Sequence, residues 1–192
     1  NEMNAHLQMV TGPSIEKTGD LASILSMLEP GDILFIDEIH RLPKVVEEVL
    51  YSAMEDYCIS IVSPRDGGGV PLNLTVPPFT LIGATTRAGD LTAPLRARFG
   101  ITEKLNYYSL DEIEDIVRRT SRVFKTKIDE STVVLLAERS RGTPRIANRL
   151  FRRVRDFANF KGKDEISKDD ALEALAALKV DCLGLDDVDV KY

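Results

Sequence analysis

Ile33-Leu-Phe-Ile-Asp-Glu38 is the stretch that decides the fold of this chain. Its four consecutive apolar residues predict a strand that is buried on both faces of a parallel sheet. Two carboxylates follow at the carboxyl end of this strand, where open α/β sheets bind their ligands. Asp37 can hold Mg²⁺ there, directly or through water, because this ion prefers hard oxygen ligands and keeps several waters. Glu38 can orient the water that attacks a phosphate, although strands also often end in acidic residues at the surface.

The composition limits the class of protein. The 192 residues are 43% apolar and 29% charged, which suffices for one ordinary domain or two small ones. The net charge of -6 argues against broad nucleic-acid binding by these residues alone, because such domains are usually basic. No apolar run approaches the ~18 residues that span a bilayer, so we expect no membrane segment. Cys58 and Cys182 are far apart, offer no disulfide framework and favour a reducing, cytoplasmic setting.

The first half of the chain has the pattern of an α/β unit. We expect strands at 7–10 and 33–37, separated by a helix at 20–28. This order predicts that the two strands pair in parallel, because parallel neighbours need such a crossover. A second helix, with an apolar stripe from Val45 to Met54, is expected after the acidic pair.

A β-hairpin is expected after that helix. Its two runs, 58–61 and 70–76, flank the glycine-rich loop 63–69. On the second run Leu72 and Leu74 alternate with polar residues, so one face of the hairpin is apolar. Such a face must either pack on the body of the domain or meet a partner, and the residues alone leave both interpretations open.

Two further candidates follow the hairpin. The strand expected at 79–87 ends in hydroxyl groups and a cation, so Thr85 can hold the attacking water or the terminal phosphate. A threonine at a strand end can equally be satisfied by backbone groups, and this alternative stays open. The short helix expected at 93–100 carries Arg96 and Arg98, which point in different directions because they are two positions apart. One of them can serve the fold while the other faces outward.

The pattern changes after one more strand, which is expected at 101–106. Helical spacing then recurs in four segments, without a sheet, near 109–117, 133–137, 143–157 and 167–178. The first of these segments opens with Ser109-Leu-Asp-Glu112, which has the pattern of a capping box. Arg145 lies in the first turn of the third helix, where a cation opposes the helix dipole. Phosphate binding at the helix N-terminus explains this placement, and so does an ion pair with a carboxylate.

Taken together and in this order, the motifs resemble the RuvB family of AAA+ ATPases, bacterial motors of Holliday-junction branch migration. Four strings carry the resemblance: Gly31-Asp-Ile-Leu-Phe-Ile-Asp-Glu-Ile-His-Arg-Leu42, Pro78-Phe-Thr-Leu-Ile-Gly-Ala-Thr-Thr-Arg-Ala-Gly89, Pro94-Leu-Arg-Ala-Arg-Phe-Gly100 and Arg141-Gly-Thr-Pro-Arg-Ile-Ala-Asn-Arg149. The resemblance covers nearly all 192 residues. It implies an α/β fold, a parallel P-loop NTPase-type sheet with a hairpin insertion and an all-helical lid. We expect the partial ATPase domain at 1–106, the lid at 107–180 and a linker at 181–192.

The resemblance implies catalytic roles for four residues. Asp37 and Glu38 match the Walker B pair, which coordinates Mg²⁺ and positions the hydrolytic water. Thr85 matches sensor 1. Arg98 matches the arginine finger, which reaches the γ-phosphate held by the neighbouring subunit.

Binding roles are implied for five more residues. Arg145 matches sensor 2, which contacts the γ-phosphate within its own subunit. Tyr108 and Pro144 match positions that line the adenine pocket. Leu72 and Leu74 match the apolar prong that docks on RuvA.

The family further implies ATP and Mg²⁺ as cofactors and assembly into a hexameric ring. RuvA and Holliday-junction DNA are the implied partners, with RuvC resolvase as a further candidate. The DNA is expected to bind mainly through a winged-helix domain that would follow the linker at 181–192.

The sequence departs from the family in two places. It contains no P-loop of the form Gly-x-x-x-x-Gly-Lys-Ser/Thr, which the family has shortly before Asn1, and no winged-helix domain. We therefore expect a fragment that binds ATP poorly and hydrolyses little by itself. A clamp-loader or initiator-type AAA+ switch is an alternative, which the hairpin and the Ala-Thr-Thr-Arg-Ala-Gly string disfavour. A non-enzymatic module that binds RuvA is another.

Overall fold

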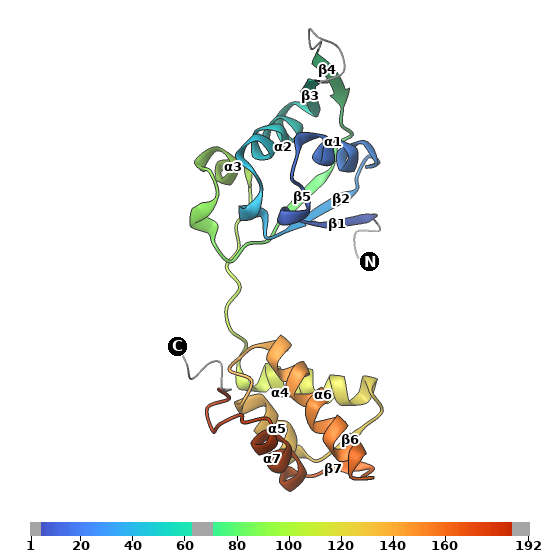
Figure 1. Ribbon diagram of the computed structural model, residues 1–192, viewed down its shortest axis with the longest axis vertical. Helices are drawn as coiled ribbons and strands as arrows, with labels where there is room; N and C mark the ends of the chain where they lie inside the picture. Colours follow the sequence, from blue (N-terminus) through green and yellow to red (C-terminus); the bar gives the residue numbers. More distant parts are fainter. Residues whose placement is uncertain (1–4, 63–70, 186–192) are drawn as a thin grey trace. The chain divides into compact units, whose positions relative to one another are not determined.

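A computed structural model describes residues 5–62 and 71–185 of the protein, and Figure 1 shows the course of the chain. The loop expected at 63–69 and the end of the expected linker, 186–192, lie outside the described residues. Among the helices of the described part, none is long and apolar enough to cross a membrane. The chain divides into two compact units, each of which is described by itself.

The first unit, Asn1–Glu103, is built on a parallel sheet in which β2 lies between β1 and β5. In chain order its elements are β1 (Leu7–Thr11), α1 (Thr18–Ser26), β2 (Ile33–Asp37), α2 (Lys44–Asp56), β3 (Cys58–Val62), β4 (Pro71–Thr75), β5 (Thr80–Gly83) and α3 (Ala93–Arg98). The predicted parallel pairing of β1 with β2 is confirmed, and β3 and β4 form the predicted antiparallel hairpin.

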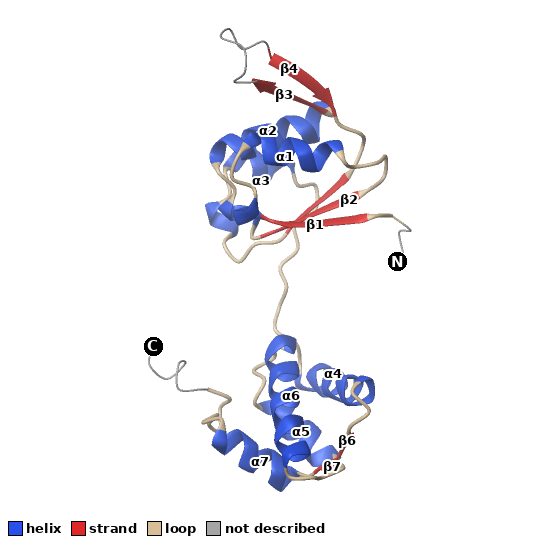
Figure 2. Cartoon of the chain, turned by 45° about the vertical axis from the view of Figure 1, so that its right-hand side comes forward, coloured by secondary structure: helices blue, strands red, loops and turns tan. Residues whose placement is uncertain are grey.

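The described helices of this unit cover one face of the sheet (Figure 2). Leu34 and Ile36 of β2 are fully buried in a core that they share with α1 and α2. Ile33 and Phe35 on the other face are only half-buried. Their neighbours on that face are exposed: Leu7, Met9 and Ile82. The prediction that β2 is buried on both faces is therefore wrong, because a second apolar face needs a second covering layer.

The prediction of a strand at 101–106 is also wrong. These residues have no regular secondary structure, and Leu105 is 93% exposed. A strand needs a neighbour for its backbone hydrogen bonds, and the described residues supply none to this segment. The division between the two units falls within it, after Glu103.

The second unit, Lys104–Tyr192, is built mainly of helices in the part that the structure describes. In chain order its elements are α4 (Leu110–Val123), β6 (Lys127–Ile128), α5 (Glu130–Glu138), α6 (Pro144–Phe160), β7 (Glu165–Ile166) and α7 (Lys168–Ala177). The short strands β6 and β7 pair in parallel, which the sequence pattern did not predict.

A cap at the start of α4 and a shared apolar core stabilise the helices of the second unit. At the start of α4, Ser109 N donates to Glu112 Oε2 at 2.8 Å and Glu112 N donates to Ser109 Oγ at 3.3 Å, which confirms the predicted capping box. Phe151 of α6 is completely buried in a core with residues of α4, α5 and α7. That core includes Ile113, Val117, Leu136, Val154, Ala171 and Leu175.

Candidate functional site

The carboxyl ends of β2 and β5 meet at one edge of the sheet, and three candidate residues belong to this edge. Asp37 is the last residue of β2, and Thr85 follows the end of β5 by two residues. Two hydrogen bonds join the main chain beyond the strands: Ala84 N donates to Ile36 O at 2.9 Å, and Ile39 N donates to Ala84 O at 3.0 Å. The sheet edge thus holds the acidic pair and the threonine segment side by side.

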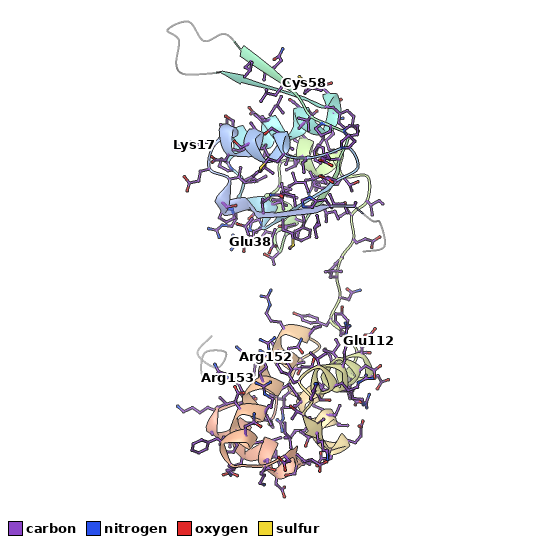
Figure 3. The ribbon with its side chains drawn as sticks, turned by 90° about the vertical axis from the view of Figure 1, so that its right-hand side faces the viewer. Lys17, Glu38, Cys58, Glu112, Arg152 and Arg153 are labelled. Atoms are coloured by element: carbon purple, nitrogen blue, oxygen red, sulfur yellow. The ribbon has the colours of Figure 1, made fainter. Side chains whose placement is uncertain are left out.

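Glu38 has a backbone conformation that is uncommon for a residue with a side chain. Its φ of 49° and ψ of 41° lie in the left-handed region, which costs about 1–3 kcal/mol. Asp37 Oδ1 accepts a hydrogen bond from Glu38 N at 2.9 Å, and Arg41 Nη1 lies 3.1 Å from Glu38 Oε2. Figure 3 shows Glu38 at the rim of its unit. Such strain concentrates at functional sites, and here it lies at the edge where open α/β sheets generally bind their ligands.

The donor set at this edge suits Mg²⁺. Asp37 is exposed, and while its Oδ1 accepts the Glu38 amide, the other carboxylate oxygen has no partner among the described residues. Magnesium sites beside phosphates commonly take one or two carboxylates and complete their shell with waters and phosphate oxygens. Asp37 therefore fits the metal role that the resemblance implies.

The hydroxyl group of Thr85 is within hydrogen-bond distance of a histidine that the sequence interpretation did not single out. Thr85 Oγ1 lies 2.9 Å from His40 Nδ1 and accepts a hydrogen bond from Arg87 N, also at 2.9 Å. The backbone alternative therefore describes one of its contacts, and His40 makes the other. The signal for His40 in the sequence was its position two residues after Glu38, on the turn that follows the strand.

Arg98, at the last position of α3, lies against α2 of its own unit. Its guanidinium carbon is 4.4 Å from the centre of the Tyr51 ring, and Nη2 donates to Tyr51 Oη at 2.6 Å and pairs with Glu55. The hydrogen bond to Tyr51, together with the Glu55 carboxylate, raises the pKa of Arg98. The side chain stays 34% exposed. Sequence interpretation missed Tyr51 and Glu55, whose four-residue spacing on one helix was the available signal.

A shallow groove of about 320 Å³ lies beside Arg98. Its other lining residues are mainly apolar: Met54, Tyr57, Phe79, Leu81, Phe99, Gly100 and Ile101. Phe99 also packs near the end of β5, because a Cβ on Gly83 would lie 3.1 Å from its Cζ. Phe99, the residue after Arg98, thereby packs against the parallel sheet of the first unit.

The remaining nucleotide-binding candidates belong to the second unit. Tyr108 N donates to Gly142 O at 2.9 Å, and Gly142 has a φ of +66°. A Cβ on Gly142 would lie 2.7 Å from Tyr108 O, so the loop before α6 requires glycine. This contact brings Tyr108 close to Pro144 and Arg145 at the start of α6.

Arg145 begins a row of arginines on α6. Among the described residues no carboxylate forms an ion pair with it, and both interpretations of its position, phosphate binding and an ion pair, stay open. A groove of about 420 Å³ along this face is lined by Arg145, Asn148, Arg149, Arg152, Arg153 and Asp156. Figure 3 shows Arg152 and Arg153 on this helix. The groove suits an anionic ligand.

The hairpin divides its apolar residues between two environments. Leu74 is half-buried and packs against the core of the first unit, whereas Leu72, nearer the far end, is 57% exposed. On the opposite face Ser60 Oγ donates to Asn73 Oδ1 at 2.5 Å across the strands. Leu74 therefore packs on the body of the unit, and the interpretation that the apolar face meets a partner stays open at Leu72.

Comparisons with known proteins match both units. Residues 1–105 match the family model of the Holliday junction DNA helicase RuvB P-loop domain, and residues 108–181 match that of the RuvB AAA lid domain. The chain is 59% identical over 191 residues to the Holliday junction branch migration complex subunit RuvB of Lactobacillus gasseri. It is 57% identical over 192 residues to that of Acholeplasma laidlawii.

These matches cover the whole chain but only 56% and 57% of the two relatives, so the chain spans a little over half of their length. A solved structure of Thermotoga maritima RuvB, described as a Holliday junction branch migration motor, has a TM-score of 0.85 and 45% identity. That match covers 97% of this chain and 57% of the Thermotoga chain.

Proposed function

The chain belongs to the RuvB family of AAA+ ATPases, and from this premise we propose that it is the catalytic part of an ATP-driven motor of Holliday-junction branch migration. The observation that carries the proposal is the sheet edge shared by Asp37, Glu38 and Thr85. Two backbone hydrogen bonds join the segments there, so the acidic pair and the threonine segment keep their spacing when a ligand binds.

The roles at this edge follow from the chemistry of phosphoryl transfer, which needs positioning and charge neutralisation. Asp37 would hold Mg²⁺, which when bound neutralises charge on the phosphates. Glu38 would orient the attacking water through a carboxylate that Arg41 holds at 3.1 Å. Thr85, backed by His40, would offer its hydroxyl to the water or the terminal phosphate.

Two arginines would complete the nucleotide site from different places. Arg145 would contact the γ-phosphate from the lid of the same subunit, where α6 begins, with Tyr108 and Pro144 near the adenine. Arg98 would reach the nucleotide of a neighbouring subunit, and the apolar groove beside it suits such a contact. An arginine supplied in trans is worth about 10³–10⁵ in rate, so hydrolysis would depend on ring assembly.

The partners follow from the same premise. We infer a hexameric ring, in the cytoplasm, that acts on Holliday-junction DNA together with RuvA, with RuvC as a further candidate partner. The exposed Leu72 would dock on RuvA, while Leu74 anchors the hairpin to the body of the unit. RuvA binding without catalysis is the second candidate function for this chain, and the exposed Leu72 of the hairpin favours it.

Substitution of Glu38 tests the proposal. The test uses the extended chain, meaning this chain with the P-loop segment and winged-helix domain that the family resemblance places before and after it. Glu38→Gln should lower ATP turnover by about 10²–10⁴-fold, because the amide cannot take the proton of the attacking water. Binding of ATP, measured by titration with a fluorescent analogue, should stay unchanged. Normal turnover in this variant would remove Glu38 from catalysis.

A further inference from the structure

Two side chains of α2 hold the arginine that the proposed function assigns to the neighbouring nucleotide. We propose that Tyr51 and Glu55 are positioning residues, which set the direction in which Arg98 is presented to the γ-phosphate bound by an adjacent copy of the chain. This inference rests on the proposed role of Arg98 and adds to it the two side chains that orient its guanidinium group.

The positioning groups belong to one stripe of α2. Glu47, Tyr51 and Glu55 are spaced by four residues, which places them on one face of the helix. The side-chain hydrogen bonds of these three residues, within the described part of the chain, are made to α3 and the residue before it. Glu47 Oε2 accepts a hydrogen bond from Thr92 Oγ1 at 2.6 Å, and Tyr51 and Glu55 bind Arg98.

The residues of this stripe form hydrogen bonds at both ends of α3. Thr92 immediately precedes the helix and Arg98 is its last residue. Between these two contacts Leu95 is buried in the core of the unit. Glu47 is only 5% exposed, so its hydrogen bond to Thr92 is shielded from water. A six-residue helix has little stability of its own, and the stripe therefore determines where α3 and its terminal arginine lie.

The contacts leave part of the guanidinium for a second acceptor. Both polar contacts of Arg98 are made by Nη2, to the Tyr51 hydroxyl and to the Glu55 carboxylate. A guanidinium carries five N–H donors in a planar fork, so the hydrogens on Nε and Nη1 can bind two phosphate oxygens. The Tyr51 ring lies under the plane and restricts its tilt. These contacts thus restrict the Arg98 side chain to few orientations before a phosphate binds.

Conservative substitutions in the extended chain test this assignment. Tyr51→Phe keeps the ring and removes the hydroxyl, and Glu55→Gln keeps the shape and removes the charge. Glu48→Gln is the matched control, because Glu48 is an exposed glutamate on the same helix outside the stripe. We expect each positioning variant to lower kcat for ATP about tenfold with KM within about twofold, since small misplacements of a catalytic group carry costs of this order. The control should match the parent protein.

Combining the positioning variants with Arg98→Ala distinguishes failure of the positioning role from failure of the proposed role of Arg98. If Tyr51 and Glu55 act through Arg98, adding Tyr51→Phe or Glu55→Gln to Arg98→Ala should cause no further loss. Normal turnover in Arg98→Ala alone would overturn the proposed role of Arg98. A low turnover in Arg98→Ala with normal Tyr51→Phe and Glu55→Gln would overturn only the positioning role. Faster turnover in Glu55→Gln would also overturn it, because Glu55 would then restrain Arg98.

Discussion

Gly12 and Glu38 show how single residues determine the acidic edge. Glu38 keeps a left-handed backbone, and Gly12, the residue after β1, lies directly against its carbonyl group. A Cβ on Gly12 would be 2.4 Å from that oxygen, a separation that real structures do not tolerate. The glycine is therefore required by the close approach of two strand ends.

Gly12→Ala should destabilise the chain by about 1–3 kcal/mol, because the backbone of the acidic edge must move to admit the methyl group. The matched control is Gly19→Ala in α1, where a Cβ meets nothing within 4 Å. There the substitution should stabilise by about 0.5–1 kcal/mol through helix propensity. Urea denaturation followed by circular dichroism measures both changes. Equal behaviour of the two variants would contradict the steric argument.

Asp170 links the stability of the second unit to pH. An ion pair with Lys163 and a hydrogen bond from the Ser167 hydroxyl lower the pKa of Asp170 to about 2. A carboxylate whose pKa is lowered by folding stabilises the folded state at neutral pH. This contribution is complete above the unfolded pKa of about 4 and is lost as the pH falls from there towards 2.

Asp170→Asn should therefore flatten the loss of stability between pH 4 and 2, while lowering stability at pH 7. Asp169→Asn is the matched control, because Asp169 is its exposed neighbour in the first turn of α7. The measurement is the urea midpoint of the helical signal at a series of pH values. A parallel pH profile for Asp170→Asn and the parent chain would contradict the assignment.

At the scale of elements, the hairpin shows how one strand serves two purposes. The inner end of β4 is held by the half-buried Leu74, and Val76 beyond it is buried. The outer residue Leu72 remains exposed. Burial of the base keeps the hairpin in place, so the apolar side chain of Leu72 is exposed without a core beneath it.

Leu72→Asp should weaken RuvA capture in a pull-down by at least about tenfold, because a charge replaces an apolar anchor. Asn73→Asp is the matched control, because it adds the same charge on the opposite face of the same strand. The thermal stability of Leu72→Asp should stay unchanged, since Leu72 is exposed. Equal retention of both variants would defeat the hairpin assignment. Leu74→Asp is a poorer test, because it also disturbs the core.

At the scale of the whole molecule, the candidate site is divided among separate bodies. Asp37, Glu38 and Thr85 belong to the first unit, whereas Arg145 belongs to the second. Arg98 is proposed to act on yet another copy of the chain. The proposed function thus assigns catalytic roles to residues of both units and of a second copy of the chain, so hydrolysis would depend on assembly.

Mixed rings test this division. In the extended chain, Arg98→Ala subunits keep an intact water-activating edge, and Glu38→Gln subunits keep an intact arginine. Neither variant alone should hydrolyse ATP at more than a few per cent of the parent rate. Mixing them should restore part of the turnover, because an Arg98→Ala site then receives its arginine from a Glu38→Gln neighbour. No recovery at any mixing ratio would count against action in trans.

The predictions from sequence succeeded where they depended on near neighbours in the chain. The capping box at Ser109 and the alternation in the hairpin each involve residues a few positions apart, and both are confirmed. The prediction failed for 101–106, because no strand of the described residues pairs with this segment. For β2, the apolar run predicted two buried faces, and burial of the second depended on a covering layer.

The sequence by itself determined the helices, the three strands of the parallel sheet, the hairpin and the acidic pair at a strand end. These features follow from periodicity, caps and turn residues, which act over a few positions. Only the tertiary structure decided that Thr85 meets His40 and that Arg98 lies on Tyr51 and Glu55. These partners are more than forty positions apart in the chain, and no local pattern specifies a contact that forms only when distant elements pack together.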